Sequence, residues 1–169
     1  MALYTIWNGP APTTAAQLKV TTGTVVKTLL QISSSATKPA KIVEWGISFD
    51  GFAAALPISV ELIETDVAAT VTAHVTAGIV KTDGEALAGG DPVTNLIPVG
   101  TAATGYTASA EGTIAATRVL DTQLVAPTNQ YVKQFPLGRE PIIQISKFAR
   151  IRVTAGTAVN ALCYMVIEI

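Results

Sequence analysis

The chain has 169 residues, which is enough for one domain with a sizeable hydrophobic core. Its net charge is only −1. Proteins bind nucleic acid largely through the phosphates that Lys and Arg neutralise, so this charge argues against a nucleic-acid partner. Charged residues make up 14% of the chain, against roughly 25% in typical soluble domains. Because interface cores are poor in Lys, Glu and Asp, we expect partners to cover much of the surface. A Thr-rich β domain that stays monomeric is the alternative.

Cysteine use and the first residues bear on where the protein is made. The single cysteine, Cys163, excludes an internal disulfide and lies in an apolar stretch, where a buried and inert thiol is the default. The first residues lack the basic and apolar regions of a signal peptide, and no run reaches the ~18 apolar residues of a membrane span. These features predict a soluble, reduced protein made in the cytoplasm, with no membrane partner.

Residues 1–16 are predicted to form an extended N-terminal arm ahead of a single domain of residues 17–169. The two prolines of this segment exclude a helix, because proline removes a backbone donor and biases the preceding residue to an extended conformation. Tyr4, Ile6 and Trp7 are large apolar side chains in this arm. They either pack into the edge of their own core or dock on a neighbouring subunit, and we take them as candidate partner-binding residues.

Strands are expected over residues 17–20 and 24–32, and the second alternates in a way that allows burial on both faces. The clearest strand pattern follows in residues 41–65. In its first half two sets of side chains alternate, one apolar (Val43, Trp45, Ile47, Phe49) and one small or acidic (Glu44, Gly46, Ser48, Asp50). In its second half Ile58, Val60 and Leu62 share one face. This period of two predicts strands with one buried face.

The middle of the chain is less regular. Residues 66–80 alternate from Val71 onward, but their alanines also permit a short helix. Residues 83–112 are rich in glycine and proline, and we expect a surface excursion with short strand pieces around residues 106–108.

Strand character returns in the last third of the chain, over residues 113–125, 131–135, 142–145, 148–154 and 161–169. Arg150 and Arg152 share a strand face, which indicates a solvated or interface face rather than a phosphate site. The last strand is almost continuously apolar, which suits a central position in a sandwich. Eight or so short strands with Gly/Pro punctuation and no long helix predict an all-β, antiparallel β-sandwich, most plausibly a jelly roll.

Catalytic motifs are weak. His74 is the only histidine, so any Ser-His-Asp or Cys-His machinery must use it, and a pair with Cys163 has no further support. The glycine and serine ahead of Phe49 match a nucleophile elbow only at its start. The glycine spacing of residues 100–107 resembles a phosphate loop, but Tyr106 stands where lysine is needed.

Metal and carboxylate chemistry is equally poorly supported. Zinc needs a set of Cys and His ligands, and the chain has one of each. Asp83, Glu85 and Asp91 lie close together in sequence and allow weak calcium binding, although solvated acids explain them better. Glu61 and Glu64 fall on opposite faces of their strand, which argues against a glycosidase pair. We therefore expect no enzyme, no cofactor and no metal site.

Three stretches of the chain carry a family resemblance: residues 28–32, 43–51, and 149–155 ahead of a Tyr-containing apolar terminus. They resemble the β-rich capsid decoration (cement) proteins encoded by actinobacterial siphophages. The similarity covers about half of the chain and rests on strand sequences rather than catalytic motifs.

The resemblance implies a jelly-roll protein on the outer surface of a phage capsid. It would be made in the host cytoplasm, assemble as a homotrimer, bind the major capsid protein and brace the shell against DNA pressure. No catalytic residues come with the family. Two alternatives remain: another virion jelly roll, such as a tail or fibre-base component that binds carbohydrate through Tyr106 and Tyr131, and a jelly-roll enzyme, which a single histidine makes a poor candidate.

Overall fold

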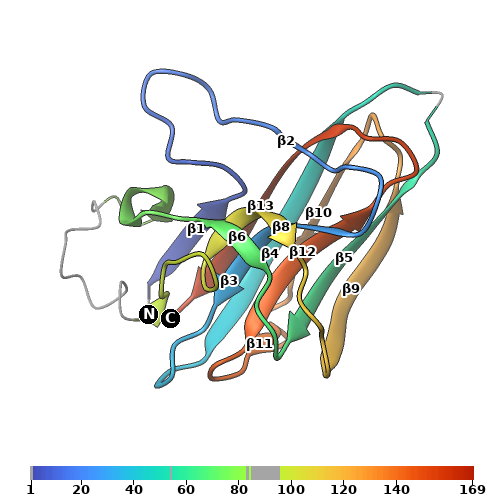
Figure 1. The fold of residues 1–169 in the computed structure, drawn as a ribbon. Coiled ribbons are helices and arrows are strands. Elements are labelled where there is room, and N and C mark those ends of the chain that lie inside the picture. Colours follow the sequence, from blue (N-terminus) through green and yellow to red (C-terminus); the bar gives the residue numbers. More distant parts are fainter. Residues whose placement is uncertain (1, 54, 83, 85–95) are drawn as a thin grey trace.

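The computed structural model describes residues 2–53, 55–82, 84 and 96–169, and their strands form two antiparallel sheets packed face to face (Figure 1). Sheet A contains β10 (Gln130–Gln134), β4 (Ala40–Asp50), β13 (Asn160–Glu168), β1 (Leu3–Trp7) and β7 (Ile79–Lys81) in that order, with β11 (Ile142–Ile143) on β4 and β2 (Val20–Thr21) on β13. Sheet B contains β6 (Thr70–Ala73), β8 (Gly105–Ala110), β3 (Lys27–Ser33), β12 (Phe148–Thr154), β5 (Ile58–Thr65) and β9 (Thr117–Val125). The predicted all-β sandwich is confirmed.

The strand pairing is that of a jelly roll. Eight of the described strands form the jelly roll, and they pair antiparallel from the outside of the sequence inward: β1 with β13, β3 with β12, β4 with β10, and β5 with β9. One member of each consecutive pair β1/β3, β4/β5, β9/β10 and β12/β13 lies in each sheet. The chain is thus one long antiparallel hairpin that is rolled up, so that its successive strand pairs lie alternately in sheet A and sheet B.

An insertion occupies the tip of this rolled hairpin, between β5 and β9. Its described residues include β6, a 3-10 turn (Thr76–Gly78), β7 and β8. Strands β6 and β8 extend sheet B beyond β3, whereas β7 extends sheet A beyond β1. The ambiguous stretch of residues 66–80 is therefore two short strands around a single helical turn. The strand expected around residues 106–108 is confirmed in β8, and part of the predicted excursion lies outside the described residues.

Alternation in β4 places side chains much as predicted, with one correction. Trp45, Ile47 and Phe49 are buried between the sheets, but Ile42 occupies the inner position that the alternation gave to Val43. The cause is a β-bulge: Glu44 pairs with Val166 and Ile42 with Ile167, so Val43 is an extra residue. One inserted residue reverses the faces on one side of the bulge.

The expectation of an N-terminal arm outside the sandwich is wrong for Leu3–Trp7. These residues form β1, which pairs with β13 on one side and β7 on the other. Tyr4 and Ile6 are buried in the hydrophobic core of their own chain, at 5% and 0% exposed, so they offer no surface to a partner. Trp7 is half-buried on the outer face of sheet A.

Among the other predicted strands, some are shorter in the structure than in the prediction and others match it. The strands expected at residues 17–20 and 142–145 shrink to the two-residue β2 and β11. The strand expected at residues 24–32 begins later, at Lys27, and from Thr28 onward it is buried on both faces as predicted. The prediction for residues 148–154 coincides with β12, and the apolar C-terminal strand β13 is central, between β4 and β1.

Arg150 departs most from its predicted setting. Its side chain is fully buried, because the insertion lies over this part of sheet B. Its Nη1 donates to the backbone oxygen of Glu111 at 3.0 Å and lies 3.3 Å from Glu111 Oε2, and its Nη2 donates to the carbonyl of Val67. Arg152, two residues along, pairs with Glu61 at 2.6 Å in a partly exposed position. The two arginines share a face but not an environment.

Candidate functional site

The outer face of sheet A carries a row of directly paired residues that crosses four strands of the sheet. Trp7 on β1 is paired with Tyr164 on β13, and Tyr164 is paired with Gly46 on β4. Gly46 is in turn paired with Val132 on β10. The Trp7 and Tyr164 rings lie 4.8 Å apart between centroids and are tilted by 38°. The row therefore presents two aromatic rings and an exposed valine on one sheet face.

Tyr164 is held in place by both of its neighbours on β4. A Cβ atom added at Gly46 would lie 2.6 Å from Tyr164 Cε1, so the ring occupies space that only glycine leaves free. The Tyr164 hydroxyl donates a hydrogen bond to Glu44 Oε1 at 2.5 Å. Burial and then the hydrogen bond to Glu44 raise the pKa of Tyr164 to about 12, so the phenol stays protonated at neutral pH.

A second row, next to the first, contains Leu162, Ser48 and Gln130, which are also direct cross-strand partners. The outward residue of β4 is small in both rows, while its neighbours on β13 and β10 are larger. This difference in size leaves a hollow of about 250 Å³ over β4, lined by Trp7, Ile47, Ser48, Gln130, Val132, Leu162 and Tyr164.

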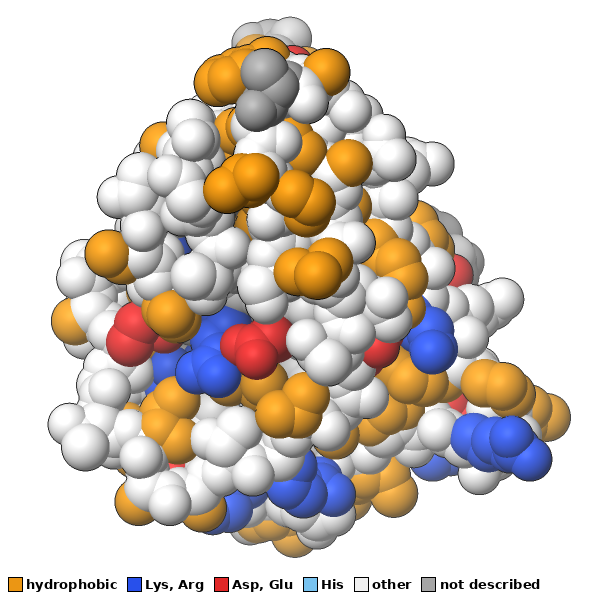
Figure 2. All heavy atoms as spheres, turned by 90° about the vertical axis from the view of Figure 1, so that its right-hand side faces the viewer, with side chains coloured by type: hydrophobic (Ala, Val, Ile, Leu, Met, Phe, Trp, Pro, Cys, Tyr) orange, Lys and Arg blue, Asp and Glu red, His pale blue; other side chains and the backbone are white. Residues whose placement is uncertain are grey.

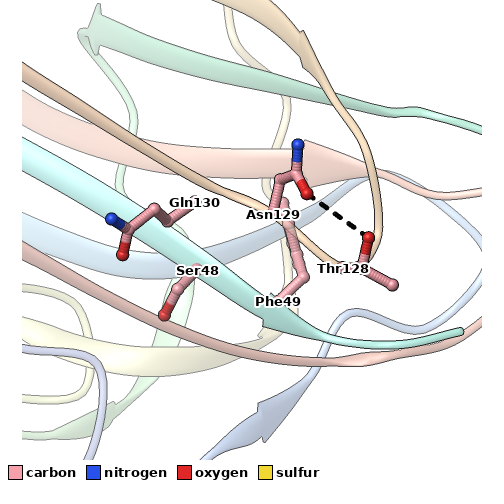
Figure 3. Close-up of a pocket in the computed structure, with 5 residues that line it drawn as sticks. All are labelled: Ser48, Phe49, Thr128, Asn129 and Gln130. Atoms are coloured by element: carbon pink, nitrogen blue, oxygen red, sulfur yellow. Dashed lines mark hydrogen bonds between the residues drawn. The ribbon is translucent and has the colours of Figure 1, made fainter. Parts of the chain in front are cut away.

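Two further hollows adjoin the first and share lining residues with it. One, of about 230 Å³, shares Trp7 and Leu162 and continues between the end of β1, the segment of residues 9–17 and the 3-10 turn. The other, of about 490 Å³, shares Ser48 and Gln130 and is open and polar, with Thr128 and Asn129 at its rim (Figure 3). We call this series of three hollows the outer groove. None of the described residues that line it is charged.

A second exposed feature lies at one end of the sandwich, where the loops of residues 22–26, 51–57, 126–129 and 155–159 meet (Figure 1). Phe52 and Leu56 are 57% and 74% exposed, and Val25 and Val26 are 70% and 42% exposed. Figure 2 shows hydrophobic side chains toward the upper tip of the molecule and charged side chains in a band below it. We call Val25, Val26, Phe52 and Leu56 the apolar loop end.

The three predicted partner-binding residues separate in the structure. Tyr4 and Ile6 belong to the core, and Trp7 lines two of the hollows in the outer groove. Tyr164, which completes the aromatic pair, was not singled out from the sequence. The available signal was the run of small outward residues, Gly46 and Ser48, on a strand whose other face is large and apolar. Such a run leaves room for a neighbouring ring.

His74 and Cys163 are both buried, and neither is placed for catalysis. His74 Nε2 lies 2.7 Å from the Trp7 carbonyl oxygen and must carry the proton to donate to it. Burial lowers the pKa of His74, and its Nδ1 has no hydrogen-bond partner among the described residues. Burial raises the pKa of the Cys163 thiol well above its usual value, which leaves it unreactive.

The structure also shows where the other residues considered for catalysis or metal binding lie. Glu61 pairs with Arg152, whereas Glu64 accepts hydrogen bonds from Arg118 Nε at 2.8 Å and from the backbone N–H of Gln144 at 2.7 Å. Both carboxylates therefore serve ion pairs. Ser48 lies within a continuous strand rather than at a strand-to-helix turn. The acids proposed for calcium (Asp83, Glu85, Asp91) lie outside the described residues, and the described part of the chain contains no cluster of three metal-ligating side chains.

The two tyrosines considered for carbohydrate stacking face inward. Tyr106 on β8 packs edge-on against His74, with ring centroids 4.9 Å apart. Tyr131 on β10 packs edge-on against the buried Trp45 at 5.4 Å, and its hydroxyl donates to Asp121 at 2.9 Å. Both rings are partly buried and pack against another ring on the inner side of their strand.

Comparisons of this chain with models of protein families, with curated proteins and with solved structures found no match. Within the described residues, no helix has both the length and the apolar character that crossing a membrane requires.

Proposed function

We propose that this protein is a virion structural protein that decorates and stabilises the outer surface of a phage capsid as a homotrimer. The observation that carries the proposal is the resemblance of residues 28–32, 43–51 and 149–155 to siphophage decoration proteins. These stretches coincide with β3, β4 and β12, which are interior strands of the two sheets. The resemblance therefore concerns the strands that build the jelly roll, a fold that viral capsid proteins share with lectins.

The surface supports a role in assembly. The apolar loop end exposes four hydrophobic side chains from two adjacent loops, whereas isolated exposed hydrophobic residues are normal on soluble domains. Lys19 and Asp50, which precede its two loops in the sequence, form an ion pair with each other. A patch of this kind suits contact with the major capsid protein or with another copy of the chain.

The sequence also allowed another virion jelly roll, at the tail or fibre base, or a carbohydrate-binding module. The decoration role is preferred because the resemblance is to head proteins. In this role the protein acts by binding, with no catalytic step, and its place is the outside of the shell. A neutral to slightly acidic surface suits that side better than the DNA-facing side.

Two measurements test the proposal. Light scattering over a concentration series gives the mass in solution, and a stable trimer is expected. Co-sedimentation with expanded capsids of the phage that encodes the chain is expected to show saturable binding. Replacing Phe52 and Leu56 by serine should weaken the binding, while replacing Leu137, which is 96% exposed in the loop between β10 and β11, should not.

The proposal fails if the chain stays in the supernatant when capsids are present in excess over the chain. If the control substitution at Leu137 weakens binding as much as the double substitution, the apolar loop end is not the contact and another surface must be sought.

A further inference from the structure

The outer groove has a chemical character that narrows its ligand. The described residues that line it include the paired rings of Trp7 and Tyr164, several aliphatic side chains and no charged side chain. Its open end is polar, with Thr128, Asn129 and Gln130 exposed at the start of β10 (Figure 3). Within the part of the chain that the structure describes, no hydrogen bond engages the side-chain amide of Gln130. A charged ligand would lose its hydration there without gaining a counter-charge.

The position of the groove also disfavours a protein segment. It runs across the face of sheet A, where the backbone N–H and C=O groups of β1, β13 and β4 are already shared with neighbouring strands. An extended peptide usually gains affinity from main-chain hydrogen bonds at a sheet edge. On this face its own amide groups would be desolvated without backbone partners, which costs free energy.

A saccharide avoids this cost. One side of a pyranose ring is formed by C–H groups that pack on aromatic and aliphatic surfaces, and its hydroxyls point to the rim, where they can exchange hydrogen bonds with amides and hydroxyls. The aromatic pair and Leu162 supply the apolar surface, and Ser48, Asn129 and Gln130 supply donors and acceptors. The three hollows in series give room for more than one sugar unit.

From this arrangement we propose that the outer groove binds a neutral oligosaccharide, with Trp7 and Tyr164 as the stacking surface and Gln130 as a hydrogen-bonding residue. This inference does not depend on the decoration role. A capsid-surface protein and a carbohydrate-binding module would each present the groove to solvent, so failure of one proposal leaves the other intact.

The test is isothermal titration of the full chain with cellohexaose, maltohexaose, mannohexaose and chitohexaose, and with oligogalacturonate as the charged comparison. At least one neutral sugar is expected to bind with a dissociation constant in the millimolar range or tighter, and the charged one to bind more weakly. Trp7→Ala should weaken binding about tenfold or more, as expected for an aromatic residue at the centre of a site.

Two further variants separate a binding role from a folding role. Gln130→Ala removes an exposed amide without a partner, so it should weaken binding several-fold and leave thermal unfolding unchanged. Leu124→Ala alters a side chain that is 75% exposed on β9 in the other sheet and should affect neither. The inference is overturned if no neutral sugar binds up to about 10 mM. It is also overturned if oligogalacturonate binds as well as the neutral sugars, or if Trp7→Ala and Gln130→Ala both bind like the parent.

Discussion

The outer face of sheet B is covered by the insertion, whereas the outer face of sheet A carries the outer groove. On sheet B, the insertion covers the outward residues of β3 and β12: Glu111 accepts hydrogen bonds from the backbone N–H and hydroxyl of Thr28, both at 2.6 Å, and Gln31 is bound by the backbone of Ala69 and Ala103. On sheet A, β1, β13 and β4 carry the aromatic pair and Ser48, which line the outer groove. One face is closed by polar contacts with the insertion, and the other carries the outer groove, with the charged residues Glu44 and Asp50 on the same face of β4.

This difference separates residues that hold the fold from residues available for binding. The covered face is polar, and its buried side chains Thr28, Gln31 and Arg150 form hydrogen bonds within the chain, although Arg150 Nε has no partner among the described residues. On the open face, Trp7, Leu162 and Tyr164 are partly exposed. Removing a side chain from the covered face should therefore reduce stability, whereas removing one from the open face should mainly reduce binding.

The largest expected effect is at Arg150. Replacing it by methionine leaves the Val67 and Glu111 carbonyl oxygens without this donor and the Glu111 carboxylate without its counter-charge beneath the insertion. Breaking a buried charged contact in this way should cost about 3 kcal/mol or more of unfolding free energy, measured by urea denaturation.

Arg152→Met is the matched control, because the same substitution is made on the same face of the same strand. The pair of Arg152 with Glu61 is about one quarter exposed on each side, at 23% and 25%, so its loss should cost below about 1 kcal/mol. Equal costs at the two arginines would show that the insertion does not seal this face.

A smaller effect is expected at Gly46, beneath the open face. Gly46→Ala places a methyl group against the Tyr164 ring, which must swing away and lose its hydrogen bond to Glu44. The cost should be about 1 kcal/mol, since the ring is free to move outward. In a spectrophotometric titration, the pKa of Tyr164, one of two phenols whose pKa burial raises to about 12 (the other is Tyr131), should shift toward the ordinary tyrosine range. An unchanged titration curve would mean that the ring is not held over the glycine.

The smallest predicted effect concerns His74, which joins the insertion to the end of β1. Burial lowers its pKa in the folded protein, so the unfolded chain binds the extra proton first. Stability should be complete above the ordinary histidine pKa of about 6.5 and fall as the pH drops through it, until the lower folded pKa is passed. Urea midpoints between neutral pH and mild acid measure this slope. His74→Gln should flatten it, and a variant with the parent's slope would assign the dependence to other groups.

The positions of the strands were predictable because a strand with one buried face alternates apolar and polar side chains along its sequence. Strand β13 follows this pattern along its whole length, and β5 follows it in its first half. Prediction failed at Val43, where a bulge on one strand changes the face and no residue type announces it. It also failed for Leu3–Trp7, because an alternating pair such as Tyr4 and Ile6 reads the same in a docking arm as in a strand of the parent sheet.

The candidate site was predictable only in part. Trp7 stands out in any sequence as a large residue near a terminus, but the groove depends on its registration with Tyr164, a residue more than 150 positions away. Cross-strand register is set by the whole fold rather than by local composition. The burial of Arg150 has the same origin, since the segments that cover it come from Val67 and Glu111 on two different sides of the insertion.

The central claim is that this jelly roll belongs on the outside of a capsid. The most direct measurement is cryo-electron microscopy of capsids of the encoding phage that have been incubated with the purified chain. The account predicts added density on the outer surface at positions of local threefold symmetry, with the apolar loop end turned toward the shell. Heads without added density, or density confined to the tail or fibre base, would contradict it.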